Sequence, residues 1–388
     1  MKQKLHEAIV IGGGPAGCAE AITLAQAGRP VCLLERKALP HDKVCGEFIS
    51  YDAAKSLTDL GVDLESLGAQ SIRELALYTG EKSLECKLPF PAWALSRRQL
   101  DARLLEKSRE AGVQVNTGMA VRNLHHSNPY WDLMVTSHNE PNVFHQLDLL
   151  QARTLFLATG KYEIQDWKRR EGDSANNELI GLKMHLHLDP QQMEELKGRV
   201  EVYFYNGGYA GLLPIEDGKA NLCLLVKRNL YKLCSGDWNR MLSELCKTVP
   251  PLTRRLSEAR SLWPKPLAIA GVPYGYIQPA ASVKPQLFRV GDQSAVVHSL
   301  AGDGIAIALQ SGIFAAQSYL AGESAGFYQL QTQQTYQHPI RQAQWLAKLL
   351  ATSAGRDILF AIAQRWPGLM PKVISHFRLK ENSFTKAG

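Results

Sequence analysis

The first part of the chain alternates between short apolar runs and one helical pattern. Residues Glu7–Ile11 form an apolar run that is typical of a buried parallel strand. The glycine-rich segment 12–17 follows directly, and a helical pattern runs through residues 21–28. A second apolar strand, Val31–Leu34, ends at Glu35. This order predicts a strand–helix–strand unit with two parallel strands.

The glycines after the first strand follow the spacing G-x-G-x-x-G. Gly12 allows a tight turn, Gly14 lets the backbone approach a pyrophosphate, and Gly17 lets helix and strand pack closely. The helix N-terminus offers free N–H groups to phosphate, and Glu35 can accept hydrogen bonds from a ribose. The alternative is a glycine-rich turn that binds nothing. We assign to a dinucleotide site Gly12, Gly14, Pro15, Ala16, Gly17, Glu35 and Arg36.

Later segments continue the alternation of helices and strands. The pattern predicts a helix within residues 94–113, a helix over 305–320, and strands over 113–116, 119–124, 154–158 and 286–291. The strand over 154–158 is closed by Thr159-Gly160, and the last strand ends in Gly291-Asp292. A loop with Gly302-Asp303-Gly304 precedes the second helix. These segments would complete the parallel sheet that the first unit begins.

In this order and spacing, the chain resembles the FAD-dependent oxidoreductases related to p-hydroxybenzoate hydroxylase. Within them it is most similar to the geranylgeranyl-reductase-like flavoproteins. Four features carry the resemblance: the glycine motif with Glu35, R-x-x-L-D at Arg97–Asp101, the segment 158–160, and Gly291-Asp292 with its glycine loop. The Cys45-Gly46 pair in Lys43–Glu47 adds to them, because reductase-like members carry a similar pair.

The resemblance implies FAD as the cofactor and gives the remaining motifs their expected roles. Arg97 would reach the pyrophosphate or ribityl chain; otherwise it is a solvated residue at a helix start. Asp292 would accept hydrogen bonds from ribityl hydroxyls; otherwise it is a helix N-cap. The junction 302–305 would bring a helix N-terminus to the flavin; otherwise it is a bare loop-to-helix junction. The implied FAD contacts beyond the first unit are Arg97, Thr159, Gly160, Gly291, Asp292, Gly302, Asp303, Gly304 and Ile305.

The chain also departs from that family. Aromatic hydroxylases carry an Asp-Gly pair where this chain has Thr159-Gly160-Lys161. The sequence therefore does not predict whether NAD(P)H reduces the flavin directly. No second G-x-G-x-x-G follows a strand, and the sequence has no C-x-x-C. The W-x-W-x-I-P pattern of flavin-dependent halogenases is absent as well. The electron donor is therefore either NAD(P)H or a partner protein, such as a reductase or ferredoxin.

The middle of the chain predicts an antiparallel sheet that would hold the substrate. Residues 179–188 alternate, with Leu182, Met184, Leu186 and Leu188 on one face and Lys183, His185 and His187 on the other. Further strands are expected over 200–205, 210–213 and 220–226. His185 and His187 have no third metal ligand nearby in sequence, so we expect surface histidines and no metal site. The segment 209–214 only partly matches the Y-x-W-x-F-P pattern that lines the lipid cavity in reductase-like enzymes.

Two residues are candidates for catalysis. Cys45 follows a strand-to-loop exit expected near the flavin, and its neighbour Lys43 would favour the thiolate. His298 lies between Asp292 and Gly302, where an imidazole could transfer protons. For both residues, packing without catalysis is the alternative.

The C-terminal part is helical and basic. Residues 340–350 and 358–366 have apolar stripes, and segment 341–388 holds eight Lys/Arg and two Asp/Glu, a charge of 8 − 2 = +6 within the total of +7. We favour helices that pack on the FAD domain. The alternative is a membrane-facing surface with Trp345, Trp366 and Phe377.

Composition and motifs together define a fold class and three functions. The 388 residues, 45% hydrophobic and 21% charged, exclude a disordered or collagen-like chain. We expect an α/β FAD-binding Rossmann-type domain (1–165 and 285–322, with 72–96 inserted from the substrate region), a β-sheet substrate domain (166–284) and C-terminal helices (323–388). The first hypothesis is a monooxygenase-like enzyme for a hydrophobic or aromatic small molecule. The others are a flavin-dependent C=C reductase and a flavoprotein that modifies or escorts a protein. Nucleic acid is not expected as a partner.

The N-terminus lacks a signal-peptide pattern, and no run of about eighteen apolar residues is present. A cytoplasmic protein, with or without peripheral membrane contact, is therefore expected.

Overall fold

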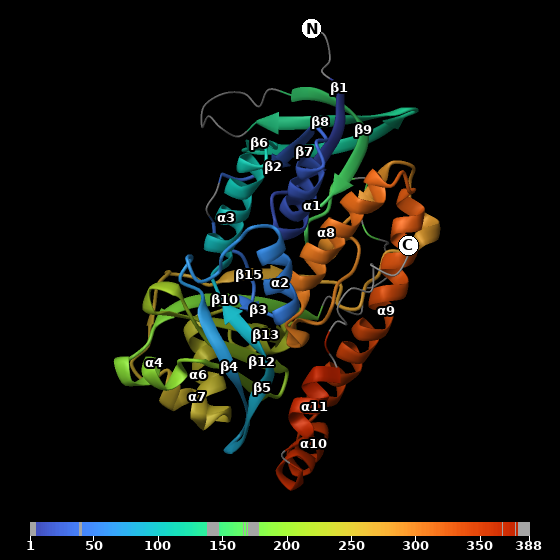
Figure 1. Ribbon diagram of the computed structural model, residues 1–388. Helices are drawn as coiled ribbons and strands as arrows, with labels where there is room; N and C mark the ends of the chain where they lie inside the picture. The colour runs from blue at the N-terminus through green and yellow to red at the C-terminus, as the bar shows by residue number, and fades with distance from the viewer. Residues whose placement is uncertain are drawn as a thin grey trace.

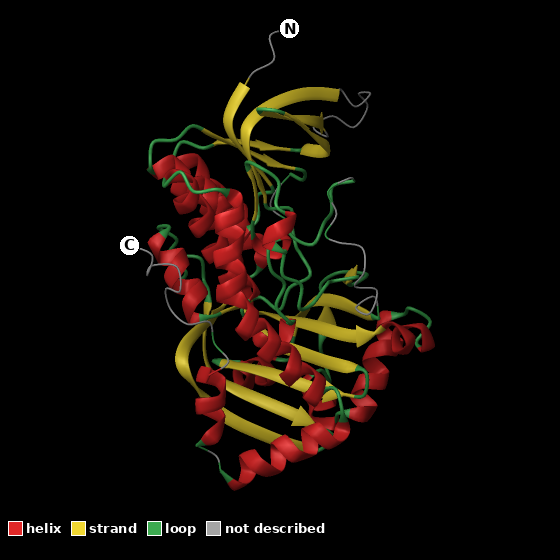
Figure 2. Cartoon of the chain, turned by 90° about the vertical axis from the view of Figure 1, so that its right-hand side faces the viewer, coloured by secondary structure: helices red, strands yellow, loops and turns green. Residues whose placement is uncertain are grey.

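Two large β-sheets organise the chain. The computed structural model describes residues 5–38, 41–137, 147–165, 167, 169, 178–366, 368–376 and 378. Figure 1 shows the first sheet near the N-terminus and the second sheet at the other end, with long helices beside and between them. Figure 2 shows the same two layers from the side.

The first sheet has seven strands in the order β6-β2-β1-β9-β8-β7, with β16 paired to β9. Strands β1, β2, β6, β9 and β16 pair in parallel, and β7 and β8 add an antiparallel edge. This confirms the predicted Rossmann-type architecture, whose central strand β1 carries fully buried Ile9 and Val10. The bounds are β1 (Leu5–Ile11), β2 (Val31–Glu35), β6 (Gln114–Thr117), β7 (Met119–Ser127), β8 (Tyr130–Ser137), β9 (Leu147–Leu157) and β16 (Leu287–Arg289).

Four helices cover the cofactor side of this sheet. They are α1 (Pro15–Gln26), α2 (Tyr51–Asp59), α3 (Arg97–Glu110) and α8 (Gly304–Leu320). Helices α1 and α8 cross closely, and a Cβ on Gly312 would lie 2.2 Å from the carbonyl oxygen of Ala16. A glycine is therefore required at this crossing, which fixes the N-terminus of α8 near the glycine loop.

The second sheet has nine strands in the order β14-β10-β13-β12-β11-β4-β5-β3, with β15 paired to β10. Its bounds are β3 (Phe48–Ile49), β4 (Gln70–Thr79), β5 (Lys82–Ala94), β10 (Leu179–His187), β11 (Arg199–Tyr205), β12 (Gly208–Ile215), β13 (Lys219–Lys227), β14 (Arg260–Ser261) and β15 (Leu267–Ala270). The four strands predicted from the middle of the chain pair antiparallel as expected, and β11 additionally pairs in parallel with β4. The β4–β5 hairpin comes from a distant part of the chain, so no short turn dictates its direction.

One face of the second sheet is closed by short helices. These are α4 (Pro190–Leu196), α5 (Arg228–Leu233), α6 (Trp238–Thr248) and α7 (Pro250–Arg255). Met241 and Leu245 of α6 join Leu182, Met184 and Leu186 of β10 in one buried cluster. The predicted apolar face of β10 is therefore confirmed, and the cofactor domain lies toward its other face.

Three helices complete the described chain: α9 (Ala325–Leu350), α10 (Ser353–Arg365) and α11 (Leu369–His376). Helix α9 begins well before the predicted start at residue 340 and continues through Pro339. Its buried Tyr328 and Tyr336 join the core of the cofactor domain, and this burial outweighs the helix-breaking tendency of proline. Phe360 of α10 instead packs with Phe204 of the second sheet. Within the described residues, no helix is long and apolar enough to cross a membrane.

Candidate cofactor and substrate site

The glycine loop between β1 and α1 is shaped by close backbone contacts. Gly12 has φ 116°, and a Cβ on it would lie 2.4 Å from the carbonyl oxygen of Ala158. A Cβ on Gly17 would lie 2.0 Å from the carbonyl oxygen of Gly12, which is the close packing that the motif predicts. Gly14 is different, because the nearest atom to its Cβ position is the Arg97 guanidinium at 4.0 Å. The loop therefore leaves room at Gly14, directly before the N-terminus of α1.

Glu35 anchors the end of β2 beside this loop. Its Oε2 accepts a hydrogen bond from the Gly13 amide at 2.7 Å, and its Oε1 accepts one from the Lys37 amide at 3.0 Å. The neighbouring Arg36 places its guanidinium 3.5 Å from the ring centroid of Tyr162. The ribose contact predicted for Glu35 and the cofactor contact predicted for Arg36 stay predictions.

Arg97 is held rigidly in front of the glycine loop. Its guanidinium donates two hydrogen bonds of 2.9 Å to Asp101, which is fully buried and also pairs with Lys43 at 2.7 Å. Burial alone would raise the pKa of Asp101, but Arg97 and Lys43 outweigh it and hold the pKa below its usual range. Arg97 is therefore not a solvated arginine at a helix start. It presents a fixed cation near Gly14, where a pyrophosphate would lie.

The ends of β9 and β16 meet at the same edge of the sheet. Gln293 donates a hydrogen bond of 2.9 Å to the carbonyl of Gly160, and Thr159 donates one of 2.7 Å to the carbonyl of Tyr162. Gly291 has φ 58°, and a Cβ on it would lie 3.0 Å from the Cβ of Ala16. Asp292 therefore lies beside the start of α1, in the short helix 291–293, and its carbonyl accepts a hydrogen bond from Arg169 at 2.7 Å.

The junction before α8 shows the expected free helix N-terminus. Helix α8 begins at Gly304, and a Cβ there would meet no described atom within 4 Å. Asp303 is turned away from it and pairs with Arg378 at 2.8 Å. Burial raises the pKa of Asp303 to about 6, although Arg378 opposes the shift. The backbone amides at 302–305 can therefore bind a cofactor, whereas the Asp303 side chain forms an ion pair with Arg378 in the C-terminal segment.

These residues fit FAD. Gly14 follows β1, Gly160 follows β9 and Asp292 follows β16, and these strands are neighbours in the parallel part of the sheet. A Cβ would meet no described atom within 4 Å at Gly46, Gly160 or Gly304, so the surrounding backbone is accessible. The carboxyl edge of a parallel sheet, with a free helix N-terminus and a buried arginine, is suited to a dinucleotide.

A buried charge cluster joins the loop that carries Glu47 to the second sheet. Glu47 is fully buried, has φ 59°, and accepts hydrogen bonds from the Lys183 ammonium at 2.5 Å and from the Arg97 amide at 2.7 Å. Its other oxygen lies 2.7 Å from Nε2 of His185. Burial alone would raise the pKa of Glu47, but Lys183 and His185 outweigh it and keep the pKa lowered. We call Glu47, Lys183 and His185 the Glu47 cluster.

The sequence prediction for this face of β10 was wrong. Lys183 is fully buried and His185 is 5% exposed, whereas the alternation placed both on a polar surface. The loop carrying Glu47 covers them, and only His187 is exposed as expected. A lysine and a histidine alternating within an apolar strand, together with an acid in a loop of the cofactor unit, were the available signal. Nothing in the sequence linked the two segments.

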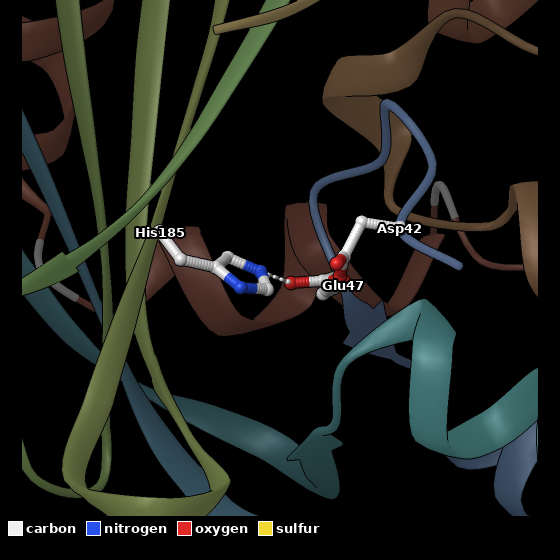
Figure 3. Close-up of side chains that lie close together, drawn as sticks. All are labelled: Asp42, Glu47 and His185. Atoms are coloured by element: carbon white, nitrogen blue, oxygen red, sulfur yellow. Dashed lines mark hydrogen bonds and ion pairs between the residues drawn. The ribbon is translucent and has the colours of Figure 1, made fainter. Parts of the chain in front are cut away.

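Three of the nearby side chains could in principle ligate a metal. Figure 3 shows His185 and Asp42 on either side of Glu47, and one ligand atom from each lies within 4.8 Å of the others. However, the Lys183 ammonium already bonds to Glu47, and it lies 3.9 Å from Asp42. A cation here would compete with a built-in ammonium group, so we assign the cluster no metal.

Cys45 lies between the Glu47 cluster and the glycine loop. Its sulfur accepts a hydrogen bond from the Glu47 amide at 3.4 Å, and it also interacts with the Arg97 guanidinium. Its carbonyl accepts a hydrogen bond from Asn221 at 3.1 Å. The thiol is half-buried and close to a fixed cation, as the sequence predicted, although the cation that it contacts is Arg97.

His298 lies among aromatic rings. Its ring centroid lies 4.8 Å from that of Tyr274 in a tilted arrangement, and its Nδ1 accepts a hydrogen bond from the Leu300 amide at 3.3 Å. Burial lowers the pKa of His298 to about 4, so the imidazole is neutral at physiological pH. These contacts favour the packing alternative over proton donation.

The second sheet presents a mixed surface toward the cofactor domain. Lys183 pairs across the strands with Cys223, and His185 pairs with Asn221, so these four residues share one face. Gly211 continues this face on β12, and a Cβ on it would meet only the Cys223 carbonyl at 3.9 Å. The face is thus polar at one end and has room beside Gly211, where a substrate could lie.

Comparisons with known proteins find FAD-binding and reductase relatives. The FAD binding domain family matches residues 6–140. A menaquinone reductase of Mycolicibacterium smegmatis is 23% identical over 94% of this chain and 89% of its own length. A digeranylgeranylglycerophospholipid reductase of Methanosphaera stadtmanae is 24% identical over 79% of this chain and 76% of its own length. Among solved structures, a flavin-dependent brominase superposes with a TM-score of 0.76, at 18% identity over 96% of this chain and 93% of its own, which shows the shared fold.

Proposed function

Because the chain is an FAD-dependent oxidoreductase of the p-hydroxybenzoate hydroxylase-like superfamily, we propose that it reduces carbon–carbon double bonds in a hydrophobic, isoprenoid-type lipid. The observation that carries this proposal is the extent of similarity to two reductases whose names refer to lipids. It includes the second sheet as well as the FAD-binding part, since one of them matches 94% of the chain. The monooxygenase-like hypothesis has no comparable support from the substrate side.

The second sheet supports a long apolar substrate. Val202 and Phe204 lie on the same face as Gly211, since β11 pairs with β12 there. Val202 and Phe204 belong to an apolar cluster, while Leu225 belongs to a neighbouring one with Tyr274. Because Val202 and Phe204 are already covered by Phe360 of α10, a chain of apolar carbons would lie beside Gly211, with a more polar group toward Asn221 and Cys223.

The residues of this chain have separate tasks in such a reaction. Arg97 and the glycine loop would hold the pyrophosphate, and the amides at 302–305 would face the flavin. When bound and reduced, FAD would supply a hydride to one alkene carbon while the other carbon takes a proton, so that the alkene is reduced and the flavin oxidised. The thiol of Cys45 is the nearest candidate to hold that proton, and the Glu47 cluster holds the loop that carries it.

The electron donor is proposed to be a partner protein rather than NAD(P)H alone. Lys161 belongs to the segment Thr159-Gly160-Lys161 that stands where aromatic hydroxylases carry Asp-Gly, and Tyr274 and Asp292 lie near it. Burial would lower the pKa of Lys161, but these neighbours raise it, so the side chain stays cationic. We expect NAD(P)H alone to reduce bound FAD slowly, and a reductase or ferredoxin to do so faster. Rapid bleaching by NADPH in stopped-flow absorbance, without a partner, would show this to be wrong.

A mass measurement tests the reaction. The FAD-loaded protein, reduced with dithionite without oxygen, is mixed with a geranylgeranyl phospholipid, which has no quinone ring that dithionite could reduce. We expect the product to gain about 2 Da per reduced bond. A gain of about 16 Da that requires oxygen would replace the proposal with the monooxygenase hypothesis. The matched control is Gly14→Val, which should give no product because it lacks the cofactor.

A further inference from the structure

The outward face of α10 is unusually apolar for an exposed helix. Ile358 is 56% exposed, Ile362 is 36% exposed and Trp366, directly after the helix, is 59% exposed. The three residues are spaced four apart, so they form one stripe along the helix. Leu369, at the start of α11, is 38% exposed. We call Ile358, Ile362, Trp366 and Leu369 the α10 stripe.

The inner face of α10 is well packed, so the stripe is not exposed because the helix is poorly packed on the protein. Phe360 and Ala363 are each 1% exposed and pack in the cluster that contains Phe204 of the second sheet. Arg356 donates hydrogen bonds of 3.0 Å to the Leu350 carbonyl and 2.9 Å to the Asn206 side chain. A helix that is apolar on both faces needs a second partner on its outer face.

Charge indicates the nature of that partner. All three C-terminal helices carry exposed basic residues: Arg341 and Lys348 on α9, Arg365 on α10 and Lys372 on α11. From residue 341 to residue 378 the sequence contains a single acid, Asp357, and it pairs with Lys82 at 2.6 Å. Trp345, which is 61% exposed, lies between Arg341 and Lys348 on α9. Exposed apolar and aromatic side chains on helices with an excess of basic residues match an anionic lipid surface.

We propose that the α10 stripe docks this protein on the surface of an anionic membrane. The inference deepens the proposed function, because the inner face of the same helix packs on the sheet proposed to hold the lipid. Docking would therefore bring that sheet close to the source of a hydrophobic substrate. The contact is peripheral: the stripe would enter the headgroup region and the basic residues would face lipid phosphates.

Vesicle sedimentation tests the proposal with the full-length, FAD-loaded protein. We expect binding to phosphatidylcholine vesicles that contain about a quarter phosphatidylglycerol, and weaker binding when salt rises from about 0.1 M to about 0.5 M. The triple variant Ile358→Ser, Ile362→Ser and Trp366→Ser should bind at least roughly tenfold more weakly. The matched control is Leu233→Ser, which removes a side chain that is 83% exposed on α5 and should bind as the wild type does.

Two outcomes would overturn the proposal. One is a failure of the vesicle assay, in which either the wild type does not bind anionic vesicles or the triple variant binds them as well as the wild type. The other is a dimer in analytical ultracentrifugation that the triple variant converts to monomer, since the stripe would then be an interface between two copies. The assay needs no turnover, so it is independent of the proposed reaction. Reduction of a detergent-dissolved substrate should be unchanged in the triple variant, and a chain that binds vesicles without any reductase activity would refute the proposed function alone.

Discussion

The glycine loop, called the cradle below, and the Glu47 cluster interact with charged groups in opposite ways. The cradle, formed by Gly12, Gly14 and Gly17, is backbone with room beside it and one cation, Arg97, held in front. The Glu47 cluster is closed: its carboxylate already accepts from Lys183, His185 and the Arg97 amide. The cradle leaves space for an external anion, whereas the charged groups of the Glu47 cluster are paired with one another. The same buried arginine residue belongs to both, through its side chain in one and its amide in the other.

This difference separates binding from positioning. A region with accessible hydrogen-bond donors is stabilised by a bound ligand. A cluster of matched charges instead stabilises the contact between the chain segments that it joins. The Glu47 cluster connects residues 136 and 138 positions apart, so it holds the second sheet against the cofactor loop. Substitution of Gly14 should therefore alter FAD binding with the fold intact, and substitutions in the cluster should alter the stability of the fold.

The largest expected effect is loss of the cofactor from Gly14→Val. The Cβ position of Gly14 has only the Arg97 guanidinium at 4.0 Å, and the residue has φ −85°, so the polypeptide itself tolerates a side chain. The valine would fill the space of the pyrophosphate and cost FAD binding more than about 3 kcal/mol, over roughly a hundredfold. Absorbance of the purified protein and isothermal titration with FAD measure it.

Gly17→Val is the contrasting control for this prediction. Its Cβ would lie 2.0 Å from the Gly12 carbonyl, so we expect loss of folded protein rather than loss of FAD alone. A yellow Gly14→Val protein, or a colourless wild type that cannot be reconstituted with FAD, would contradict the assignment of the cradle.

The next effect comes from opening the closed cluster with Glu47→Gln. The variant keeps the shape of the side chain but leaves the fully buried Lys183 ammonium with Asp42, 3.9 Å away, in place of its hydrogen-bonded anion. Breaking one partner of a buried pair typically costs about 3–5 kcal/mol of unfolding free energy. Chemical denaturation of the FAD-free and FAD-loaded protein measures the cost.

The double variant Glu47→Gln, Lys183→Met sharpens the test. Removing both charges should recover most of the stability, because an apolar side chain of similar size replaces the stranded ammonium. A loss below about 1 kcal/mol in the single variant, or no recovery in the double, would mean that the cluster does not join the two sheets energetically.

The two regions also differ in how far the sequence predicts them. The cradle lies in one contiguous segment, and local spacing was enough to predict its strand and its close glycine packing, whereas Arg97 in front of it followed only from the family resemblance. The Glu47 cluster could not be predicted, because an alternating strand leaves open whether its polar face meets water or another segment. For the same reason, the parallel pairing of β11 with β4 and the continuation of α9 through Pro339 depend on long-range burial, which local patterns do not contain.

A second buried glutamate offers a contrast with Glu47. Glu20 lies on α1 behind the cradle, is fully buried, and both of its oxygens lack a hydrogen-bond partner among the described residues. Burial raises the pKa of Glu20 well above 4.5, so the folded protein keeps it neutral. Because the folded-state pKa is raised, stability is fully present below the unfolded pKa near 4.5 and falls as pH rises toward the folded-state pKa.

Glu20→Met should therefore stabilise the protein. Replacing an unpartnered buried carboxyl by an apolar side chain is expected to add about 1–3 kcal/mol. The gain should be larger near pH 8 than near pH 5, since only the wild type has to retain a proton on folding. Thermal melts of both proteins across that range measure it. An equal gain at every pH would indicate that Glu20 has the same pKa in the folded and unfolded states.

The smallest expected effect on stability concerns Cys45, which lies between the two regions. The sulfur interacts with Arg97 of the cradle and accepts from the Glu47 amide. Because the side chain is half-buried, Cys45→Ala should cost less than about 1 kcal/mol and leave FAD content unchanged. If the thiol acts in turnover, product formed per bound FAD should fall. Alkylation followed by peptide mass mapping adds a readout that needs no substrate, since FAD should protect Cys45 if the two are adjacent. The opposite pattern, a loss of about 1–2 kcal/mol with unchanged turnover and no protection by FAD, would make Cys45 a packing residue of the loop.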